Sequence, residues 1–229
     1  VEREVSFEQA AAVKAAATVK FKKKVIGNGT PASCTYEKLA KAVKSGGDIS
    51  FDCGPKKVTI EVKKTLVVCN THNCKPPWQG GKIVAKLRVN GGNKVTLSGG
   101  GERGIFYANT CDEKLAWVDG KCNTQTTPHV IFRNITFRDG NATNGPAGYE
   151  GVSGGGGGGA IAMRGGRLTV WKAKFVKNRC VARHSDAGGG AIRVTGQRKT
   201  ARIHKSTFTS NKYSNGGAVS SLQAPMRIT

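Results

Sequence analysis

The second half of the chain repeats itself, and this repeat constrains the fold more than any other feature. Three segments superpose when they are aligned on a shared phenylalanine: HVIFRNITFRDGN at 129–141, RLTVWKAKFVKN at 167–178 and TARIHKSTFTSN at 200–211. A glycine-rich turn follows each segment and leads into GGAI, GGAI or GGAV. One repeat is therefore a strand, a short strand, an asparagine turn, a glycine turn and a third strand. Units of this kind stack into a solenoid.

The chain between Gly46 and the first repeat also reads as short strands. Five segments alternate apolar and polar residues between glycines and asparagines: 58–62, 65–69, 82–89, 94–99 and 104–109. No segment after Gly46 keeps a helical period. Glycine, 32 of 229 residues, is about twice as frequent as usual, as many tight turns require. We predict an all-β domain over residues 34–229, a right-handed parallel β-helix.

Residues 1–33 form a separate helical and basic segment in this interpretation. Ser6 and Gln9 make a capping-box pattern before an alanine-rich run that favours helix, and a lysine cluster follows at 20–24. A helical cap and a leftover pro-segment explain it equally well.

A second, short helix is predicted directly after Thr35. It places Leu39, Ala42 and Val43 on one side and stops at Gly46, and a strand follows at 49–53. We expect this helix to cover the apolar opening of the first coil, as terminal repeats do in other solenoids.

The GGAI and FxxN signatures carry a family resemblance. On them the chain resembles right-handed parallel β-helix proteins of the pectate-lyase-like superfamily, and the same signatures occur in polymorphic outer-membrane protein repeats. LAKAVKSGGDISFDCG at 39–54 looks like the leading helix and first coil of secreted bacterial members. The resemblance implies this fold over about residues 34–229 and a polysaccharide lying on a strand face. That scaffold hosts lyases, hydrolases and adhesins, so it leaves the activity open.

Stacked coils place each residue above its counterpart one coil earlier. Phe137, Phe175 and Phe208 should therefore form a buried aromatic stack. Asn178 and Asn211 follow their phenylalanines by three residues, where stacked amides satisfy the turn backbone, whereas an asparagine follows Phe137 by four, so the ladder is imperfect there. We interpret both columns as structural.

Alternation along each strand supplies outward columns beside the inward ones. Aligned on the phenylalanines, these columns hold the following residues: Arg133, Trp171 and His204; Ile131, Thr169 and Arg202; and, at the bend, Asn134, Lys172 and Lys205. The candidate ligand-binding residues are the basic and aromatic members: Arg133, Trp171, Lys172, Arg202, His204 and Lys205. An exposed tryptophan among cations can stack on a sugar ring while carboxylates pair beside it. A loop covering Trp171 is the alternative.

The net charge of +23 draws polyanions at long range. Acidic polysaccharide is the predicted partner, and a basic surface without any partner is the alternative. No helix, finger or RNA-binding signature supplies base specificity, so only nonspecific, salt-sensitive binding of nucleic acid is expected. No run reaches the roughly 18 apolar residues of a membrane span.

Carboxylates are scarce where catalysis would need them. From residue 131 onward the acidic residues are Asp139, Glu150 and Asp186, against 16 lysines and arginines. Glycoside hydrolysis normally uses two carboxyl groups, and calcium needs several oxygen ligands, so we expect no cofactor and find calcium unsupported. A metal-independent β-elimination stays open, with Arg202 neutralising a uronate and His204 or Lys205 as base. WIDH-type and RxPxxR-type stretches of pectate lyases are absent. We therefore favour noncatalytic binding.

Six of the seven cysteines form close pairs in the sequence. We predict three local disulfides, Cys34–Cys53, Cys69–Cys74 and Cys111–Cys122, although other connectivities stay open. Disulfides indicate an oxidising compartment and a secreted protein. Cys180 is left without an assigned partner.

The repeat register places residues 226–229 on the first strand of another coil. Arg227 should match Arg202, and Ile228 should match Ile203. The sequence thus stops in mid-coil, which leaves strand edges open. We expect a fragment, or end-to-end association through this uncapped coil.

Overall fold

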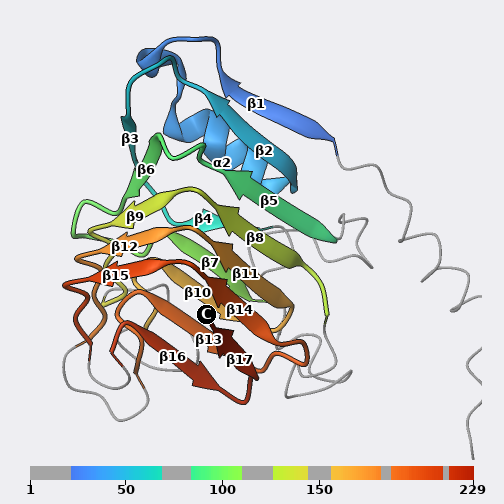
Figure 1. Ribbon diagram of the computed structural model, residues 1–229, viewed down its shortest axis with the longest axis vertical. Helices are drawn as coiled ribbons and strands as arrows, with labels where there is room; N and C mark the ends of the chain where they lie inside the picture. The colour runs from blue at the N-terminus through green and yellow to red at the C-terminus, as the bar shows by residue number, and fades with distance from the viewer. Residues whose placement is uncertain (1–21, 69–83, 110–125, 144–155, 182–186, 214–216) are drawn as a thin grey trace, which may run out of the picture.

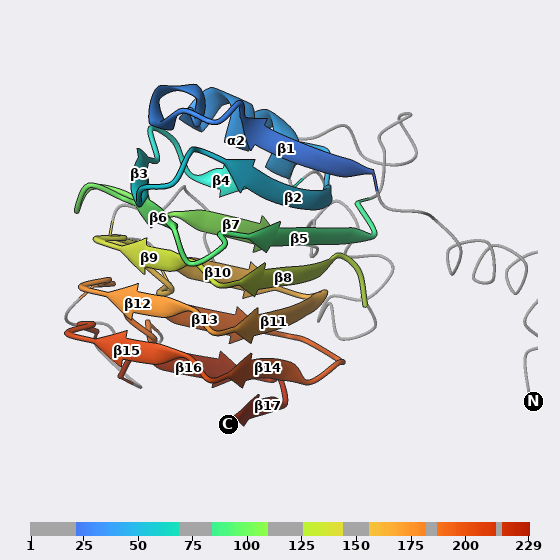
Figure 2. The ribbon, with the colours of Figure 1, turned by 45° about the horizontal axis from the view of Figure 1, so that its top comes forward.

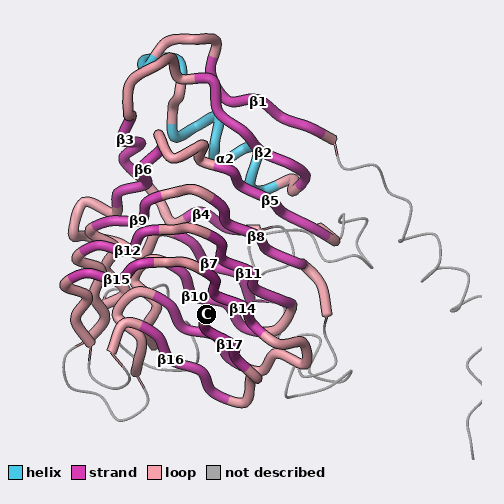
Figure 3. The backbone as a smooth tube through the Cα atoms, in the orientation of Figure 1, coloured by secondary structure: helices cyan, strands magenta, loops and turns pink. Residues whose placement is uncertain are grey.

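The computed structural model describes residues 22–68, 84–109, 126–143, 156–181, 187–213 and 217–229. Three parallel sheets wind around one core as a stack of coils (Figures 1 and 2). Strands and connecting loops alternate around the stack, and helix is confined to one end of the described chain (Figure 3). The all-β prediction is confirmed, and the three sheets are consistent with a parallel β-helix.

Each sheet takes one strand from successive coils. Sheet A contains β1 (Lys23–Gly27), β2 (Gly47–Asp52), β5 (Lys86–Asn90), β8 (His129–Arg133), β11 (Arg167–Trp171), β14 (Ala201–His204) and β17 (Met226–Ile228). Sheet B contains β3 (Val58–Glu61), β6 (Val95–Ser98), β9 (Thr136–Arg138), β12 (Lys174–Val176) and β15 (Thr207–Thr209). Sheet C contains β4 (Leu66–Val67), β7 (Phe106–Asn109), β10 (Ile161–Arg164), β13 (Ile192–Thr195) and β16 (Val219–Leu222).

The repeats pair in the register that the sequence predicts. Phe175 lies opposite both Phe137 and Phe208 across parallel pairs. Inward residues of β8, β11 and β14 are buried, because alternate side chains of a strand point to one face. The predicted match of Arg227 with Arg202 and of Ile228 with Ile203 is also confirmed.

The aromatic stack is present inside the coils. The ring centroids of Phe137 and Phe175 are 5.2 Å apart, and those of Phe175 and Phe208 are 4.8 Å apart. The rings are nearly parallel, tilted by 5° and 7°. Phe137 and Phe175 are fully buried, whereas Phe208 is only partly buried.

The asparagine ladder satisfies backbone groups in the turn after sheet B. Asn178 is fully buried, and its Oδ1 accepts from the Gly140 N–H at 2.9 Å. Its Nδ2 donates to the Phe137 carbonyl at 3.2 Å and to Asn211 Oδ1 at 3.0 Å. One coil earlier the position equivalent to Asn178 holds Gly140. A Cβ there would lie 2.1 Å from the Gly159 carbonyl oxygen, so the position requires glycine. The ladder is therefore imperfect beside Asn141, as predicted.

Replacing Asn178 with alanine should lower the free energy of unfolding by about 1–3 kcal/mol, because it leaves the buried Gly140 N–H without its acceptor and removes a second donor from the Phe137 carbonyl. Urea unfolding measures the loss. Asn90→Ala is the matched control: Asn90 Oδ1 accepts from Gly92 N and Asn134 Nδ2 at a partly exposed site where water can substitute. An equal loss in both variants would contradict the buried-ladder interpretation.

The N-terminal end of the stack holds α2 (Tyr36–Lys44) after a 3-10 turn, η2 (Pro31–Ser33). Leu39, Ala42 and Val43 are its buried residues, as predicted, and Thr35 accepts from the Lys38 N–H at its start. The helix contacts β1, β2 and β4 at this end of the stack (Figure 2).

Sheet A includes residues that the sequence assigned to the N-terminal segment. Strand β1 pairs in parallel with β2, so sheet A begins before residue 34. Within the lysine cluster, Lys24 lies in β1, and its Nζ donates to the Ala42 carbonyl at 3.2 Å, near the end of α2. Five residues with two lysines are too short and polar to reveal such a strand. The predicted helix before residue 20 lies outside the described residues.

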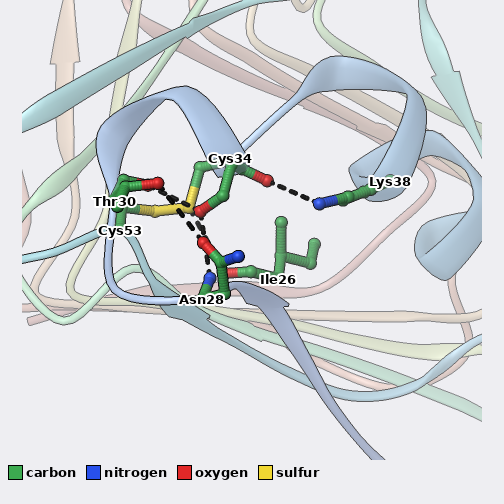
Figure 4. Close-up of a disulfide and its surroundings, with 7 residues drawn as sticks. Ile26, Asn28, Thr30, Cys34, Lys38 and Cys53 are labelled. Carbon is green, nitrogen blue, oxygen red and sulfur yellow. Dashed lines mark hydrogen bonds between the residues drawn. A yellow bond between two sulfur atoms is a disulfide. The ribbon is translucent and has the colours of Figure 1, made fainter.

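The Cys34–Cys53 disulfide is confirmed, with a Cα–Cα separation of 5.7 Å (Figure 4). Cys180 is buried in a small cluster with Tyr107, Ala142 and Ala162. The pairs predicted for Cys69–Cys74 and Cys111–Cys122 lie outside the described residues.

Within the described ranges, the only α-helix is far too short to cross a membrane.

Candidate functional site

The outer face of sheet A presents three columns of outward side chains. The Trp171 column runs along the stack through paired positions of four strands: Asn90, Arg133, Trp171 and His204. The structure therefore places Arg133, Trp171 and His204 at paired positions of β8, β11 and β14, as predicted; these strands lie side by side in Figure 2. Their role in binding remains a prediction.

The Arg202 column lies beside it, two residues earlier on each strand. Its members are Asp48, Arg88, Ile131, Thr169, Arg202 and Arg227. Arg202 and Arg227 are exposed on neighbouring strands. Arg88 and Asp48 pair at 2.9 Å. The sequence alignment reached only part of this column, because the coils before residue 129 lack the shared phenylalanine.

A third column, the His129 column, was missed by sequence reasoning. Lys86, His129 and Arg167 lie opposite one another on β5, β8 and β11. The signal was available, because His129 and Arg167 stand eight residues before Phe137 and Phe175. Continuing the same alternation by two more residues would have found both.

Trp171 is half-buried, which corrects the expectation of an exposed tryptophan. The strands of a sheet are about 4.8 Å apart, so residues in one column pack against each other. The His204 ring centroid lies 5.2 Å from that of Trp171, with the planes tilted by 49°. The two rings form an aromatic ledge with part of its surface open.

Lys172 and Lys205 lie at the bend between sheets A and B, with φ of 49° and 46°. Their N–H groups donate to the carbonyls of His204 and Thr229 in the next coil. The left-handed backbone turns the chain sharply, and both lysine side chains are exposed beside the Trp171 column. We call the outward residues of β5, β8, β11, β14 and β17, with Lys172 and Lys205, the basic face.

Carboxylates hardly neutralise the basic face. The described outward positions of its five strands contain no Asp or Glu. Asp48, on the adjoining strand β2, pairs with Arg88. Asp139 lies at the bend after β9, where its Oδ2 accepts from Arg138 Nε at 2.6 Å. Glu150 and Asp186 lie outside the described residues.

His129 lies among the cations of the basic face, and its pKa is lowered. Burial first, and then the charges of four cationic neighbours, together lower the pKa of its imidazole to about 4; these neighbours are Arg167, Lys86, Arg88 and Arg202. Its Nε2 lies 2.9 Å from the Thr169 hydroxyl. The ring is therefore neutral at pH 7, and as a base it is weak.

The described residues assemble no group of three or more His, Cys, Asp or Glu side chains that could hold a metal ion. The arrangement instead offers guanidinium and ammonium groups for oxyanions and an aromatic ledge for an apolar ring face. These are the groups that recognise the acidic and ring parts of an anionic ligand.

A concavity of about 810 Å³ lies away from the basic face, at the turn that leaves sheet B. Asn141, Arg179, Lys212 and Tyr213 are among its lining residues. Sequence reasoning did not single it out, because these residues belong to a turn without strand alternation. Arg179 Nη2 donates to the Gly101 carbonyl at 2.9 Å, which gives that guanidinium a structural role.

Comparison of the chain with protein-family models, with curated proteins and with solved structures yields no match, so the basic face has to be interpreted from its own chemistry.

Proposed function

We propose that this chain binds an acidic polysaccharide along the basic face, without catalysing a reaction on it. The observation that carries the proposal is the outer face of sheet A, where each of five successive strands contributes an arginine within three adjacent columns, while the one neighbouring described carboxylate pairs with Arg88. These residues are Arg88, Arg133, Arg167, Arg202 and Arg227. Guanidinium groups match carboxylates and sulfate esters through paired hydrogen bonds.

The geometry suits a polymer rather than a small anion. Successive strands repeat about every 4.8 Å along the stack, so an extended chain lying along it meets one or more basic positions at each coil. Trp171 and His204 offer a flat, partly open ring surface beside these charges. Stacking on one face and ion pairing beside it are what a uronic acid or sulfated sugar needs.

The resemblance to pectate-lyase-like β-helix proteins agrees with this ligand class, with a right-handed coil and with secretion. The described disulfide is compatible with an oxidising compartment. Catalysis is disfavoured, because the face lacks carboxylates and because His129 is a weak base. A uronate lyase using His204 or Lys205 with Arg202 is the outcome that the test below must exclude.

The Trp171→Ala substitution should weaken polysaccharide binding by about 1–3 kcal/mol, or 5- to 150-fold in Kd, because truncating an aromatic anchor removes its stacking surface. Calorimetry with the polymer that binds best measures the change. Tyr213→Ala is the control, since Tyr213 is an exposed aromatic residue away from the face. Equal weakening in both variants would remove the ledge from the proposal.

The test of function uses immobilised polygalacturonate, alginate, heparin and double-stranded DNA at several salt concentrations. Retention on one or more glycans at physiological salt, with weaker retention on DNA, supports the proposal. Ultraviolet absorbance of an unsaturated product would show a lyase and overturn the noncatalytic assignment. Stronger retention on DNA, or no retention on any glycan, would overturn the polysaccharide assignment.

A further inference from the structure

His129 lies at the beginning of β8 among cations contributed by several neighbouring strands. Arg167 lies opposite it on β11, and Lys86 lies opposite it on β5. The ring is half-buried, with Nε2 at 2.9 Å from the Thr169 hydroxyl. Thr169 itself lies opposite Arg202 on β14. The imidazole therefore has cationic side chains on both sides along the stack.

The charged groups that act on His129 are all cations, and one of them, Arg88, is paired with a carboxylate. Arg88 contributes a guanidinium from the adjacent column, but Asp48 on β2 neutralises it at 2.9 Å. Arg202 is exposed and makes no ion pair within the described ranges. The Nε of Arg167 is buried and has no acceptor among the described residues. Arg167 and Arg202 thus carry the charge that no described carboxylate offsets.

We propose that His129, Arg167 and Arg202 form an anion subsite of the basic face, which binds one carboxylate or sulfate ester of the polysaccharide together with a proton on His129. The inference rests on the proposed function, since the polymer carries the oxyanion, and it adds a proton to the binding equilibrium. The oxyanion accepts hydrogen bonds from the guanidinium groups. The proton comes from solvent, and the resulting imidazolium adds a third donor.

The dependence on pH follows from the two states of His129. In the free protein its pKa is about 4, so the ring is neutral above that pH. A bound oxyanion offsets the charge of the arginines and raises the pKa of His129. Between the free and bound pKa values binding takes up part of a proton, so affinity rises as the pH falls, by about tenfold in total for a pKa rise of about one unit. Above the bound pKa His129 adds no pH dependence.

The experiment follows the ring signals of His129 by NMR as a function of pH, with inorganic sulfate or galacturonate monomer as the probe and chloride at equal ionic strength as the reference. His129→Asn assigns the signal among the four histidines. We expect one or both probes to raise the pKa of His129 by about one unit. Arg202→Gln, at an exposed residue, should reduce this rise, and Arg167→Gln/Arg202→Gln should abolish it.

Lys174→Gln is the matched control, because Lys174 is an exposed cation on β12 of sheet B. It should leave the anion-dependent rise unchanged. A rise with sulfate alone assigns the subsite to sulfate esters, and a rise with galacturonate alone assigns it to carboxylates. No rise with either probe, or an equal rise in Arg167→Gln/Arg202→Gln, overturns the subsite. Polymer retention without such a rise would refute the subsite alone, whereas a rise without polymer retention would refute the proposed function alone.

Discussion

The Phe175→Ala substitution should lower the free energy of unfolding by about 3–5 kcal/mol, the usual cost of deleting a buried phenylalanine ring. Phe175 is fully buried and stacks on both sides, on Phe137 and on Phe208. Removing it leaves a cavity between two rings that β-sheet pairing holds in place, so the coils cannot close over it. Urea unfolding followed by circular dichroism measures the loss.

Phe208→Ala is the control for that prediction. Phe208 occupies the same column but is only partly buried and stacks on a single ring. Its truncation should cost about 1–2 kcal/mol, because less apolar surface leaves water on folding. If both variants lost the same free energy of unfolding, burial within the two-sided stack would not explain the loss, and removal of any phenylalanine side chain would account for it.

The phenylalanine column also shows why the repeat could be read from the sequence. A parallel coil turns each inward position into a column, so one conspicuous residue type marks the register of every strand around it. Phe137, Phe175 and Phe208 did this for three coils. In the two earlier coils of sheet B the same position holds Leu97 and Ile60, which are common in any buried strand. The register of those coils is therefore invisible without the structure.

The candidate site was predictable to the same extent. Arg133, Trp171 and His204 follow from alternation within aligned repeats, and the structure places them on paired positions. The Arg88–Asp48 pair joins residues 40 apart from two coils whose alignment no shared residue marks. Pattern reasoning cannot assign such a pair, because it depends on the length of the connection between coils.

The exposure of Trp171 could not be predicted for a different reason. Alternation states which face of the sheet a side chain occupies, and on that point the prediction was correct. The fraction of the indole ring that is exposed to water depends on the neighbours one strand away, above all His204. A half-buried ring held beside a second ring presents a fixed edge and face to a ligand, so less side-chain entropy is lost on binding.

The Cys34–Cys53 disulfide joins the two ends of the segment that contains α2 and β2. Cys34 follows η2, and Cys53 follows β2 directly. Hydrogen bonds order the neighbouring loop, among them Asn28 N–H to Ser33 Oγ at 2.9 Å and Lys38 Nζ to the Ser33 carbonyl at 3.0 Å (Figure 4). The link therefore holds the β1–β2 end of sheet A, where fewer coils contribute packing than in the middle of the stack.

Replacing both cysteines, as Cys34→Ala/Cys53→Ala, should lower the free energy of unfolding by about 3 kcal/mol, because the unfolded chain gains the entropy of an open loop spanning 19 residues. Alanine avoids burying an unpaired hydroxyl, since both positions are buried. Urea unfolding without reductant measures the loss, and amide hydrogen exchange locates it: β1 and β2 should lose protection before β11 and β14 do. An unchanged urea midpoint of unfolding would mean that the pairing of β1 with β2 already restricts this segment as much as the disulfide does. A uniform loss of protection over all coils would mean instead that the solenoid unfolds as one cooperative unit, with the disulfide acting on the whole stack.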